Sequence, residues 1–191
     1  LQATGYLLID ATNGEVLVEQ NADQPLPPAS LTKMMTAYIA EREIAEGRIS
    51  FDDKVPVSIK AWKTGGSRMF IREGTEVRLE DLLRGIVIQS GNDASVAVAE
   101  YIAGSEDVFA DVMNQTAVGL GMTNTQFKNS TGLPQDGHYT TAKDLGILAA
   151  RTIADFPKTY AIYKEKNFTY NGIKQANRNS LLFRDPSVDG L

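Results

Sequence analysis

The 191-residue chain has no cysteine and a single histidine, His138, and none of its apolar runs approaches the roughly 20 residues that a bilayer crossing needs. Disulfides and thiol catalysis are therefore excluded, and a zinc site is not expected. Positive charge is also limited, because 19 Lys and Arg stand against 24 Asp and Glu, and the basic residues are scattered. We expect no metal, no cofactor and no nucleic-acid partner.

What is present is an ordinary globular composition, with 42% hydrophobic residues and a mean hydropathy of -0.21. Residues 5–19 predict a β-hairpin with Asn13-Gly14 at its turn. Helices are predicted from Ser30 to about residue 46 and over 79–89, 92–104, 105–121 and 141–156, and strands return after residue 166. A helical block between strand-rich ends predicts an α+β fold in which helices pack against a single sheet.

The segment "PPASLTKMMTAYIA" (27–40) places Ser30 at the start of an apolar helix and Lys33 one turn later. Side chains three positions apart on a helix are neighbours. Burial lowers the pKa of a lysine amine, and a deprotonated lysine can take the proton of an adjacent serine hydroxyl. The helix N-terminus would favour a developing oxyanion. Ser30 and Lys33 are thus a candidate nucleophile and base.

Two other interpretations of this pair stay open. Serine is a favoured helix N-cap, and a lysine can extend its amine from a buried face into water. With 10 Ser and 10 Lys in the chain, S-x-x-K is expected by chance about once in two such sequences.

A second polar group, Ser90-Gly91-Asn92 in "IQSGNDASV", falls in the short gap between two helices that are predicted to be buried. Alone, Ser90 and Asn92 would be interpreted as capping groups. Following an S-x-x-K motif by sixty residues, they complete two of the three motifs of penicillin-binding proteins and class A β-lactamases.

On these motifs the sequence resembles the low-molecular-mass penicillin-binding proteins, the serine-type D-Ala-D-Ala carboxypeptidases of the penicillin-binding protein 5/6 type. The resemblance extends over nearly the whole chain and includes "YLLIDATNGEVLVEQNAD", "PASLTKMMTAYI", "YKEKNFTYNGIKQANRN" and "VDG". It implies the penicillin-binding/serine β-lactamase-like α+β fold, with an antiparallel sheet, flanking helices and a helical subdomain at about 48–157.

The resemblance also implies a role for each motif residue. Ser30 would be the acylated nucleophile, Lys33 its base and Ser90 a proton relay to the leaving amine. Asn92 would orient Lys33 and contact the substrate amide, and Arg178, on a strand near the cleft, would be a supporting substrate contact. The substrate would be a peptidoglycan stem peptide ending in D-Ala-D-Ala, and β-lactams would be covalent inhibitors. The setting would be the periplasm, with the inner membrane reached only through a C-terminal anchor outside this chain.

The sequence departs from the family at the third motif, K-T-G. The copy at Lys63-Thr64-Gly65 precedes the second motif and is predicted to be a loop of no catalytic importance. The chain stops at "VDGL", where the family continues into its K-T-G strand. Residues 1–191 are therefore expected to be the N-terminal portion of the catalytic domain, without its last strands and the family's β-rich second domain. Leu7, Ile9, Val16 and Val18 would then form an apolar edge that later strands, or a second chain that carries K-T-G, must cover.

Two rival functions remain from the sequence. A class A β-lactamase needs a glutamate some tens of residues after the second motif, but no Glu lies between Glu106 and Glu165. A penicillin-sensing domain that is acylated without turnover is the other. His138, in the turn "QDGHYTT", is predicted to be a surface or structural residue.

Overall fold

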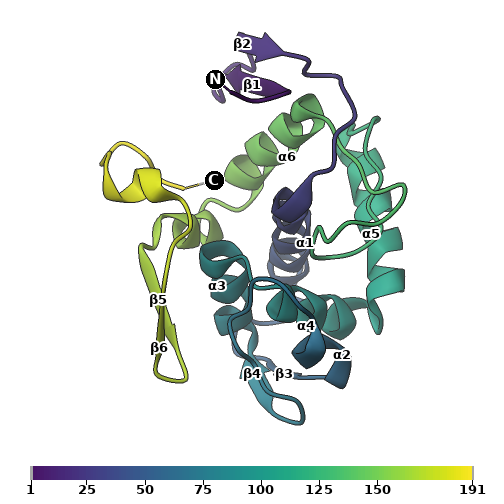
Figure 1. The fold of residues 1–191 in the computed structure, drawn as a ribbon, viewed down its shortest axis with the longest axis vertical. Helices are drawn as coiled ribbons and strands as arrows, with labels where there is room; N and C mark the ends of the chain where they lie inside the picture. Colours follow the sequence, from purple (N-terminus) through teal and green to yellow (C-terminus); the bar gives the residue numbers. More distant parts are fainter. Residues whose placement is uncertain (1, 191) are drawn as a thin grey trace.

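A computed structural model describes residues 2–190 (Figure 1). In chain order the helices and strands are β1 (Tyr6–Ile9), β2 (Val16–Gln20), a 3-10 turn (Ala29–Leu31), α1 (Thr32–Ala45), β3 (Lys54–Pro56), α2 (Ile59–Lys63), β4 (Glu76–Arg78), α3 (Leu79–Gln89), α4 (Asn92–Ala103), α5 (Glu106–Leu120), α6 (Ala142–Asp155), a 3-10 helix (Thr159–Lys164), β5 (Asn167–Tyr170), β6 (Ile173–Ala176) and a last 3-10 turn (Ser180–Phe183).

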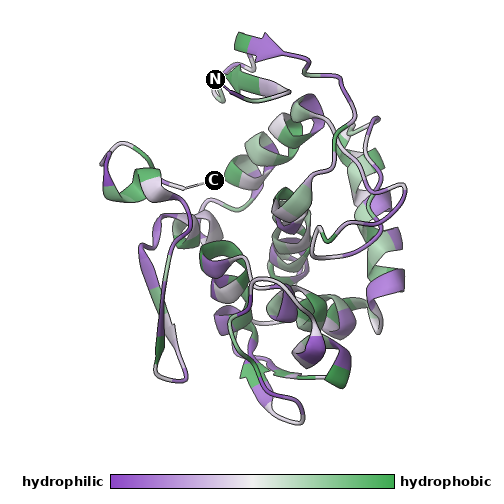
Figure 2. Ribbon diagram, viewed as in Figure 1, coloured by the Kyte–Doolittle hydropathy of each residue, from purple (hydrophilic) through white to green (hydrophobic). Residues whose placement is uncertain are grey.

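Helix α1 lies at the centre and contacts α3, α4, α5 and α6 (Figure 1). Its residues are apolar on nearly every face, and Met35, Ala37, Ile39 and Ala40 are completely buried. A helix with apolar side chains on nearly every face is stable only in the interior of a protein, where these side chains are removed from water. In Figure 2 the hydrophobic colour accordingly concentrates on α1, α3 and α4, whereas the β5–β6 hairpin is mostly hydrophilic.

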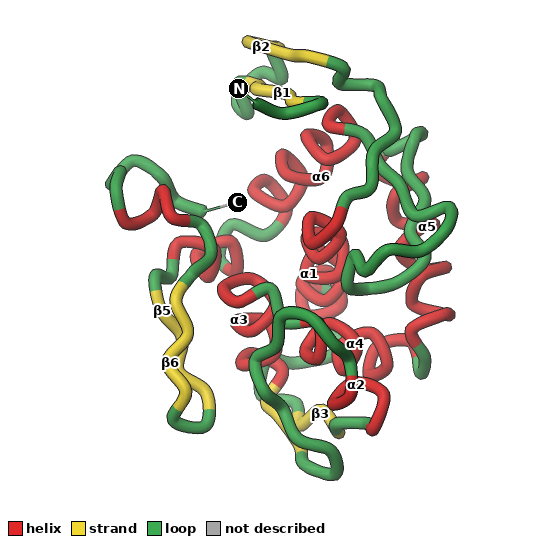
Figure 3. Tube along the Cα trace, viewed as in Figure 1, coloured by secondary structure: helices red, strands yellow, loops and turns green. Residues whose placement is uncertain are grey.

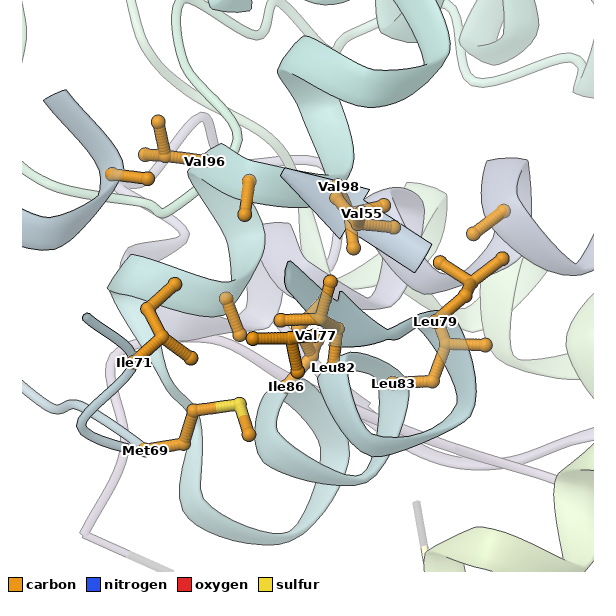
Figure 4. Close-up of a cluster of buried hydrophobic side chains, with 14 of the residues drawn as sticks. Val55, Met69, Ile71, Val77, Leu79, Leu82, Leu83, Ile86, Val96 and Val98 are labelled. Atoms are coloured by element: carbon orange, nitrogen blue, oxygen red, sulfur yellow. The ribbon is translucent and has the colours of Figure 1, made fainter. Parts of the chain in front are cut away.

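The core has two adjoining parts. One is built by α3 and α4 on the β3–β4 hairpin and includes Val55, Met69, Leu79 and Leu82 (Figure 4). The other joins α1, α5 and α6 through Met35, Phe109, Phe127 and Leu148. Both parts reach α1, so the first turn of α1 is held from several sides.

The strands do not form the single sheet that the sequence predicted. In the described residues they form three separate antiparallel hairpins, β1–β2, β3–β4 and β5–β6, which lie at the periphery around the helices (Figure 3). The β1–β2 hairpin is where it was predicted, with Gly14 in the left-handed conformation at its turn (φ 77°). The α+β class with antiparallel strands is confirmed.

The first hairpin has an exposed apolar edge, but the side chains that form it are not all the predicted ones. Leu7 packs on α6, where a side chain at Gly146 would come within 2.7 Å of its Cδ2 atom, and Ile9 is also half-buried. Leu8 is exposed instead, together with Val16 and Val18. The side of the hairpin that faces α6 is fixed by this packing, which the alternation of the sequence alone could not specify.

Most helix ends agree with the sequence to within two residues, but α1 begins at Thr32, after the 3-10 turn, and not at Ser30. Ser105 and Thr141 cap α5 and α6, accepting hydrogen bonds from the N–H groups of Val108 and Asp144. Helix α4 was expected to begin with capping side chains, but its N-cap is Gly91 and no side chain caps it. The short helix α2 was not predicted.

Candidate active site

The first residues of α1 bring an exposed hydroxyl next to a buried amine. Ser30 is exposed in the 3-10 turn before α1, and Lys33, in the first turn of α1, is only 4% exposed. Ser30 Oγ and Lys33 Nζ are 3.2 Å apart. The N-cap of α1 is Leu31, and no side chain caps the helix. The two alternative interpretations are thereby excluded, because Ser30 is not a cap and Lys33 does not reach bulk water.

Lys33 Nζ also donates a hydrogen bond of 2.6 Å to the carbonyl oxygen of Thr131, 98 positions further along the chain. Burial is the main cause that lowers the pKa of Lys33 to about 8, and the positive charge of Arg178 lowers it further, while Asp93 opposes both. An amine with this pKa is deprotonated in about a tenth of the molecules at pH 7, far more often than an ordinary lysine. It can therefore accept the Ser30 proton.

Thr131 was not singled out in the sequence, although a signal was present. It lies in "NSTG" (129–132), a run of turn residues whose Gly132 has φ 84°. A side chain at Gly132 would meet the Ala29 carbonyl oxygen at 1.7 Å, so the loop and the Ser30 turn are in close contact. Only glycine fits there.

Two non-glycine residues beside the site have left-handed backbone, Ala29 with φ 47° and Ser90 with φ 61°. This conformation is unfavourable for residues with a Cβ atom and persists where the surrounding structure enforces it. Ala29 precedes Ser30 directly, and Ser90 ends α3. Such outliers are typical of functional sites.

Ser90 lies in the same cleft as Ser30 and Lys33. Its Oγ is buried and has no hydrogen-bond partner within residues 2–190. The cleft has a volume of about 480 Å³ and is lined by Ser30, Lys33, Ser90, Tyr163, Asn177 and Arg178, among others. An unpartnered hydroxyl that faces a cleft is available to a ligand or to a proton in transit.

Asn92, which completes the second motif, is buried and points toward the loop after α2. Its Nδ2 donates to the carbonyl oxygen of Gly65 at 2.7 Å, and its backbone N–H donates to that of Ser67. The next residue, Asp93, accepts three hydrogen bonds from the backbone N–H groups of residues 69–71. Asn92 and Asp93 together therefore fix the loop of residues 65–71 against α4.

Arg178 lies two residues beyond β6, not on a strand as the sequence predicted, because β6 ends at Ala176. It is exposed, lines the cleft, and donates from Nη1 to Ser67 Oγ at 2.5 Å. Its backbone N–H donates to Ile88 O, which attaches this segment to α3 near Ser90. The guanidinium therefore puts positive charge at the cleft.

The early K-T-G copy lies at a helix end and not in the loop that was predicted. Lys63 is the last residue of α2, and the Thr64 hydroxyl donates to Lys60 O. Within the described chain, none of Lys63, Thr64 and Gly65 lines the Ser30 cleft.

An exposed serine hydroxyl beside a buried lysine amine, at the start of a buried helix, is the arrangement found in serine hydrolases of the Ser/Lys type. All residues from 1 to 191 match the model of the peptidase S11 family, described as D-alanyl-D-alanine carboxypeptidase. The chain belongs to this family.

Individual relatives with the same family name or fold are also similar to this chain. The chain is 46% identical over 198 residues to the D-alanyl-D-alanine carboxypeptidase DacA of Escherichia coli strain K12, covering 100% of this chain and 49% of that protein. The crystal structure of penicillin binding protein 5 from Haemophilus influenzae matches with a TM-score of 0.93 at 42% identity, over 96% of this chain and 54% of that one. Penicillin-Binding Protein D2 from Listeria monocytogenes, in an ampicillin-bound form, matches with a TM-score of 0.87 at 30% identity, over 100% and 78% of the two chains.

The resemblance seen in the sequence is thus confirmed for family and fold. The chain spans about half the length of the curated relatives it matches. Within residues 2–190 no helix has the length and apolarity of a membrane span. The same residues contain no cluster of acidic, histidine or cysteine side chains suited to a metal ion.

Proposed function

We propose that the protein containing this chain is a serine-type D-Ala-D-Ala carboxypeptidase, which removes the terminal D-alanine from peptidoglycan stem peptides through an acyl-enzyme on Ser30. The observation that carries the proposal is the 3.2 Å pair of an exposed Ser30 hydroxyl and a buried Lys33 amine whose pKa is lowered to about 8. The family membership supports the same reaction.

In the proposed reaction Lys33 accepts the proton of Ser30 as Oγ attacks the carbonyl carbon between the two D-alanines. The tetrahedral intermediate collapses, its C–N bond breaks, and the D-alanine amine leaves with a proton that returns from Lys33 through Ser90. Water then attacks the ester carbonyl carbon while Lys33 takes its proton, the bond from this carbon to Oγ breaks, and Lys33 returns the proton to Oγ, so that Ser30 is released as the hydroxyl. The unpartnered Ser90 Oγ in the cleft supports its relay role.

Asn92 and Arg178 are proposed as substrate contacts. For Arg178 the support is its positive charge in the cleft, which suits a peptide that ends in a carboxylate. Asn92 is committed to Gly65 through its Nδ2, which leaves its carbonyl oxygen to orient Lys33 or to accept from the substrate amide.

The wider setting is part of the same proposal. We propose that residues 1–191 are the N-terminal portion of a penicillin-binding catalytic domain, with a helical subdomain at about 48–157, and that the K-T-G strand lies outside them. β-Lactams are expected to acylate Ser30, as the ampicillin-bound form of the Listeria protein suggests. The location we propose is the periplasm, on the inner membrane through a C-terminal anchor.

The rival β-lactamase activity is not favoured. No Glu lies between Glu106 and Glu165, and the Glu106 carboxylate is occupied by the Ser130 hydroxyl and N–H and by Lys60. It therefore has no free oxygen pair with which to hold a deacylating water at Ser30.

The test uses the full-length protein and two substrates. Release of D-alanine from a stem peptide ending in D-Ala-D-Ala, together with a stable penicillin adduct mapped to Ser30 by mass spectrometry, is the expected result. Ser30→Ala should abolish both, whereas Ser187→Ala, at an exposed serine bonded to Asp185, should change neither. Rapid penicillin turnover would indicate a β-lactamase, and an adduct without peptide turnover a sensing domain.

A further inference from the structure

His138, which the sequence predicted to be a surface or structural residue, is 7% exposed and lies against the active-site helix. It belongs to the loop between α5 and α6, whose segment 126–139 is closed at its base by two hydrogen bonds between Gln126 and Tyr139. The same segment contains Thr131, which accepts the hydrogen bond of Lys33. The imidazole and the partner of the catalytic amine are therefore parts of one closed loop.

The hydrogen bonds of the ring define its tautomer. The backbone N–H of Lys128 donates to Nδ1 at 3.0 Å, so Nδ1 carries no proton. Nε2 then carries the proton of the neutral ring and donates it to the Thr32 hydroxyl, 2.8 Å away. Phe127 packs edge-on against the ring, with centroids 5.8 Å apart. Both nitrogens are thus engaged, one by the loop and one by α1.

Thr32 is the first residue of α1, completely buried, and it lies between Ser30 and Lys33 in the sequence. Together with the bonds from Lys33 to Thr131 O and from the Thr36 hydroxyl to Ser130 O (2.8 Å), the imidazole attaches the loop to three positions, 32, 33 and 36, in the first turns of the helix. Loss of the His138 bridge would free the part of the loop around Lys128, which the bonds at Ser130 O and Thr131 O do not hold directly.

Protonation would break this bridge from the loop side. A proton on Nδ1 would face the Lys128 N–H, so one hydrogen bond would be replaced by a contact between two donors. The charged groups on the ring's own loop are Lys128 and Asp136. The charged side chains of the surrounding helices that bond to this loop are Lys33 of α1, Glu106 of α5 and Asp144 of α6. Burial lowers the pKa of His138, so the neutral ring persists at neutral pH and the change occurs in acid.

We propose, on the basis of the proposed function, that His138 is a positioning residue for the Ser30/Lys33 pair. Its neutral ring holds the 126–139 loop, and with it the Thr131 carbonyl, against the first turn of α1. Protonation of the ring releases the loop and slows acylation. The ring does not touch Ser30 or Lys33. It acts through Thr32 on the helix side and through Lys128 on the loop side.

The test measures the rate of Ser30 acylation by a fluorescent penicillin in the full-length protein between pH 5 and 9. For the wild type, the rate should fall with the protonation of Lys33 below about pH 8 and then more steeply as His138 gains its proton. His138→Gln keeps an N–H donor for Thr32 but cannot be protonated in this range. It should acylate within about threefold of the wild type at pH 8 and lack the steeper acid limb.

His138→Ala should acylate about tenfold more slowly than the wild type at pH 8, as expected for the loss of a hydrogen bond to a buried group, and this difference should shrink in acid, where the wild type also loses the bridge. Thr36→Val is the matched control, since it removes one bond between the same loop and α1 without removing a titrating group. It should slow acylation but keep the steeper acid limb. An unchanged rate in His138→Ala at pH 8, or an acid limb in His138→Gln equal to that of the wild type, would overturn the proposal.

A second measurement separates this proposal from the proposed function. The 15N spectrum of the imidazole, assigned by its loss in His138→Gln, should show an unprotonated Nδ1 at neutral pH. In a protein with 13C-labelled lysine, His138→Ala should raise the pKa of Lys33, because loop release hydrates the amine. If penicillin never modifies Ser30, the proposed function fails, and an unmoved Lys33 pKa would separately refute the positioning role.

Discussion

The amine of Lys33 lies closer to the Thr131 carbonyl oxygen, at 2.6 Å, than to the Ser30 hydroxyl, at 3.2 Å. The carbonyl accepts one N–H and so fixes the direction of the remaining substituents on nitrogen. In the neutral amine the lone pair can then point at Ser30. A base that is held by a neutral acceptor keeps its lowered pKa, whereas a carboxylate in the same place would raise it.

Replacement of the base tests this arrangement. Lys33→Arg should keep the fold but lose Ser30 acylation by about a thousandfold, because a guanidinium does not release its proton at workable pH and general-base catalysis contributes roughly 10²–10⁴. The measurement is the acylation rate of the full-length variant, with circular dichroism as the check on folding. Near-normal acylation would contradict the assignment of Lys33.

The second prediction concerns the charge of Arg178. Burial is the larger cause of the low Lys33 pKa, and the guanidinium is the second, so Arg178→Gln should raise the pKa of Lys33 and move the pH at half-maximal acylation upward. It should also weaken binding of a peptide that ends in a carboxylate by about tenfold, with little effect on the same peptide as its C-terminal amide. Equal effects on both peptides would remove Arg178 from the substrate contacts.

Glu106 should stabilise the loop that contains Thr131. Burial opposes its ionisation, but Lys60 and the Ser130 hydroxyl and N–H outweigh burial and hold the pKa of Glu106 below its usual value. Its contribution to stability is therefore present above the unfolded-state pKa near 4.5 and is lost as pH falls through the folded-state value.

Glu106→Gln should accordingly cost on the order of 1–2 kcal/mol at pH 7 and much less in acid, measured by urea unfolding at both values of pH. Asp107→Asn, at the exposed next position of α5, is the matched control and should cost less than about 0.5 kcal/mol. Equal losses in the two variants would show that the Ser130 contacts carry no stability.

The parts of the site that could be predicted are those set by local geometry. Ser30 and Lys33 are three positions apart on one helix, so their proximity follows from the helix itself. The Lys33–Thr131 bond joins positions 98 apart and depends on how a loop of turn residues folds back on α1. No periodic pattern in the sequence predicts this contact between the loop and α1.

The helices and loops of the fold likewise divide into those that local sequence patterns predict and those that depend on tertiary contacts. The helices over 79–89, 92–103 and 106–120 follow from apolar spacing and from caps such as Ser105. Helix α2 has only five residues, too few for a period to be recognised. Asn92 could be interpreted as a cap from the sequence, but Asn92 and its neighbour Asp93 instead bond to the loop of residues 65–71, where their hydrogen bonds satisfy buried backbone groups.

The exposed side of the first hairpin yields a further prediction. Leu8, Val16, Leu17 and Val18 are exposed by 48–54% in these 191 residues, which is a large apolar surface for a two-stranded sheet. We expect a separate fragment of residues 1–191 to associate, to bind a hydrophobic dye and to hydrolyse no D-Ala-D-Ala peptide. The double change Val16→Thr and Val18→Thr should reduce association of the fragment but destabilise the full-length protein. A monomeric, active fragment would show that nothing further covers this surface.

The last prediction concerns Glu41, a buried acid of α1 that is 3% exposed and has one carboxylate oxygen without a partner in residues 2–190. Burial raises its pKa to about 8, against an unfolded value near 4.5, with only a partial opposing effect from Thr159. The folded protein therefore holds a proton that the unfolded chain releases, so stability is greatest below pH 4.5 and declines as pH rises toward 8.

Glu41→Gln removes this dependence of stability on pH while it keeps the shape of the side chain. The variant should be more stable than the wild type at pH 7 by on the order of 2 kcal/mol and about equal to it at pH 4. Thermal unfolding at the two values of pH is the measurement, and Glu73→Gln, at an exposed position, should show no such difference. If Glu41→Gln lowers stability at pH 7, the carboxylate is ionised and paired in the folded protein.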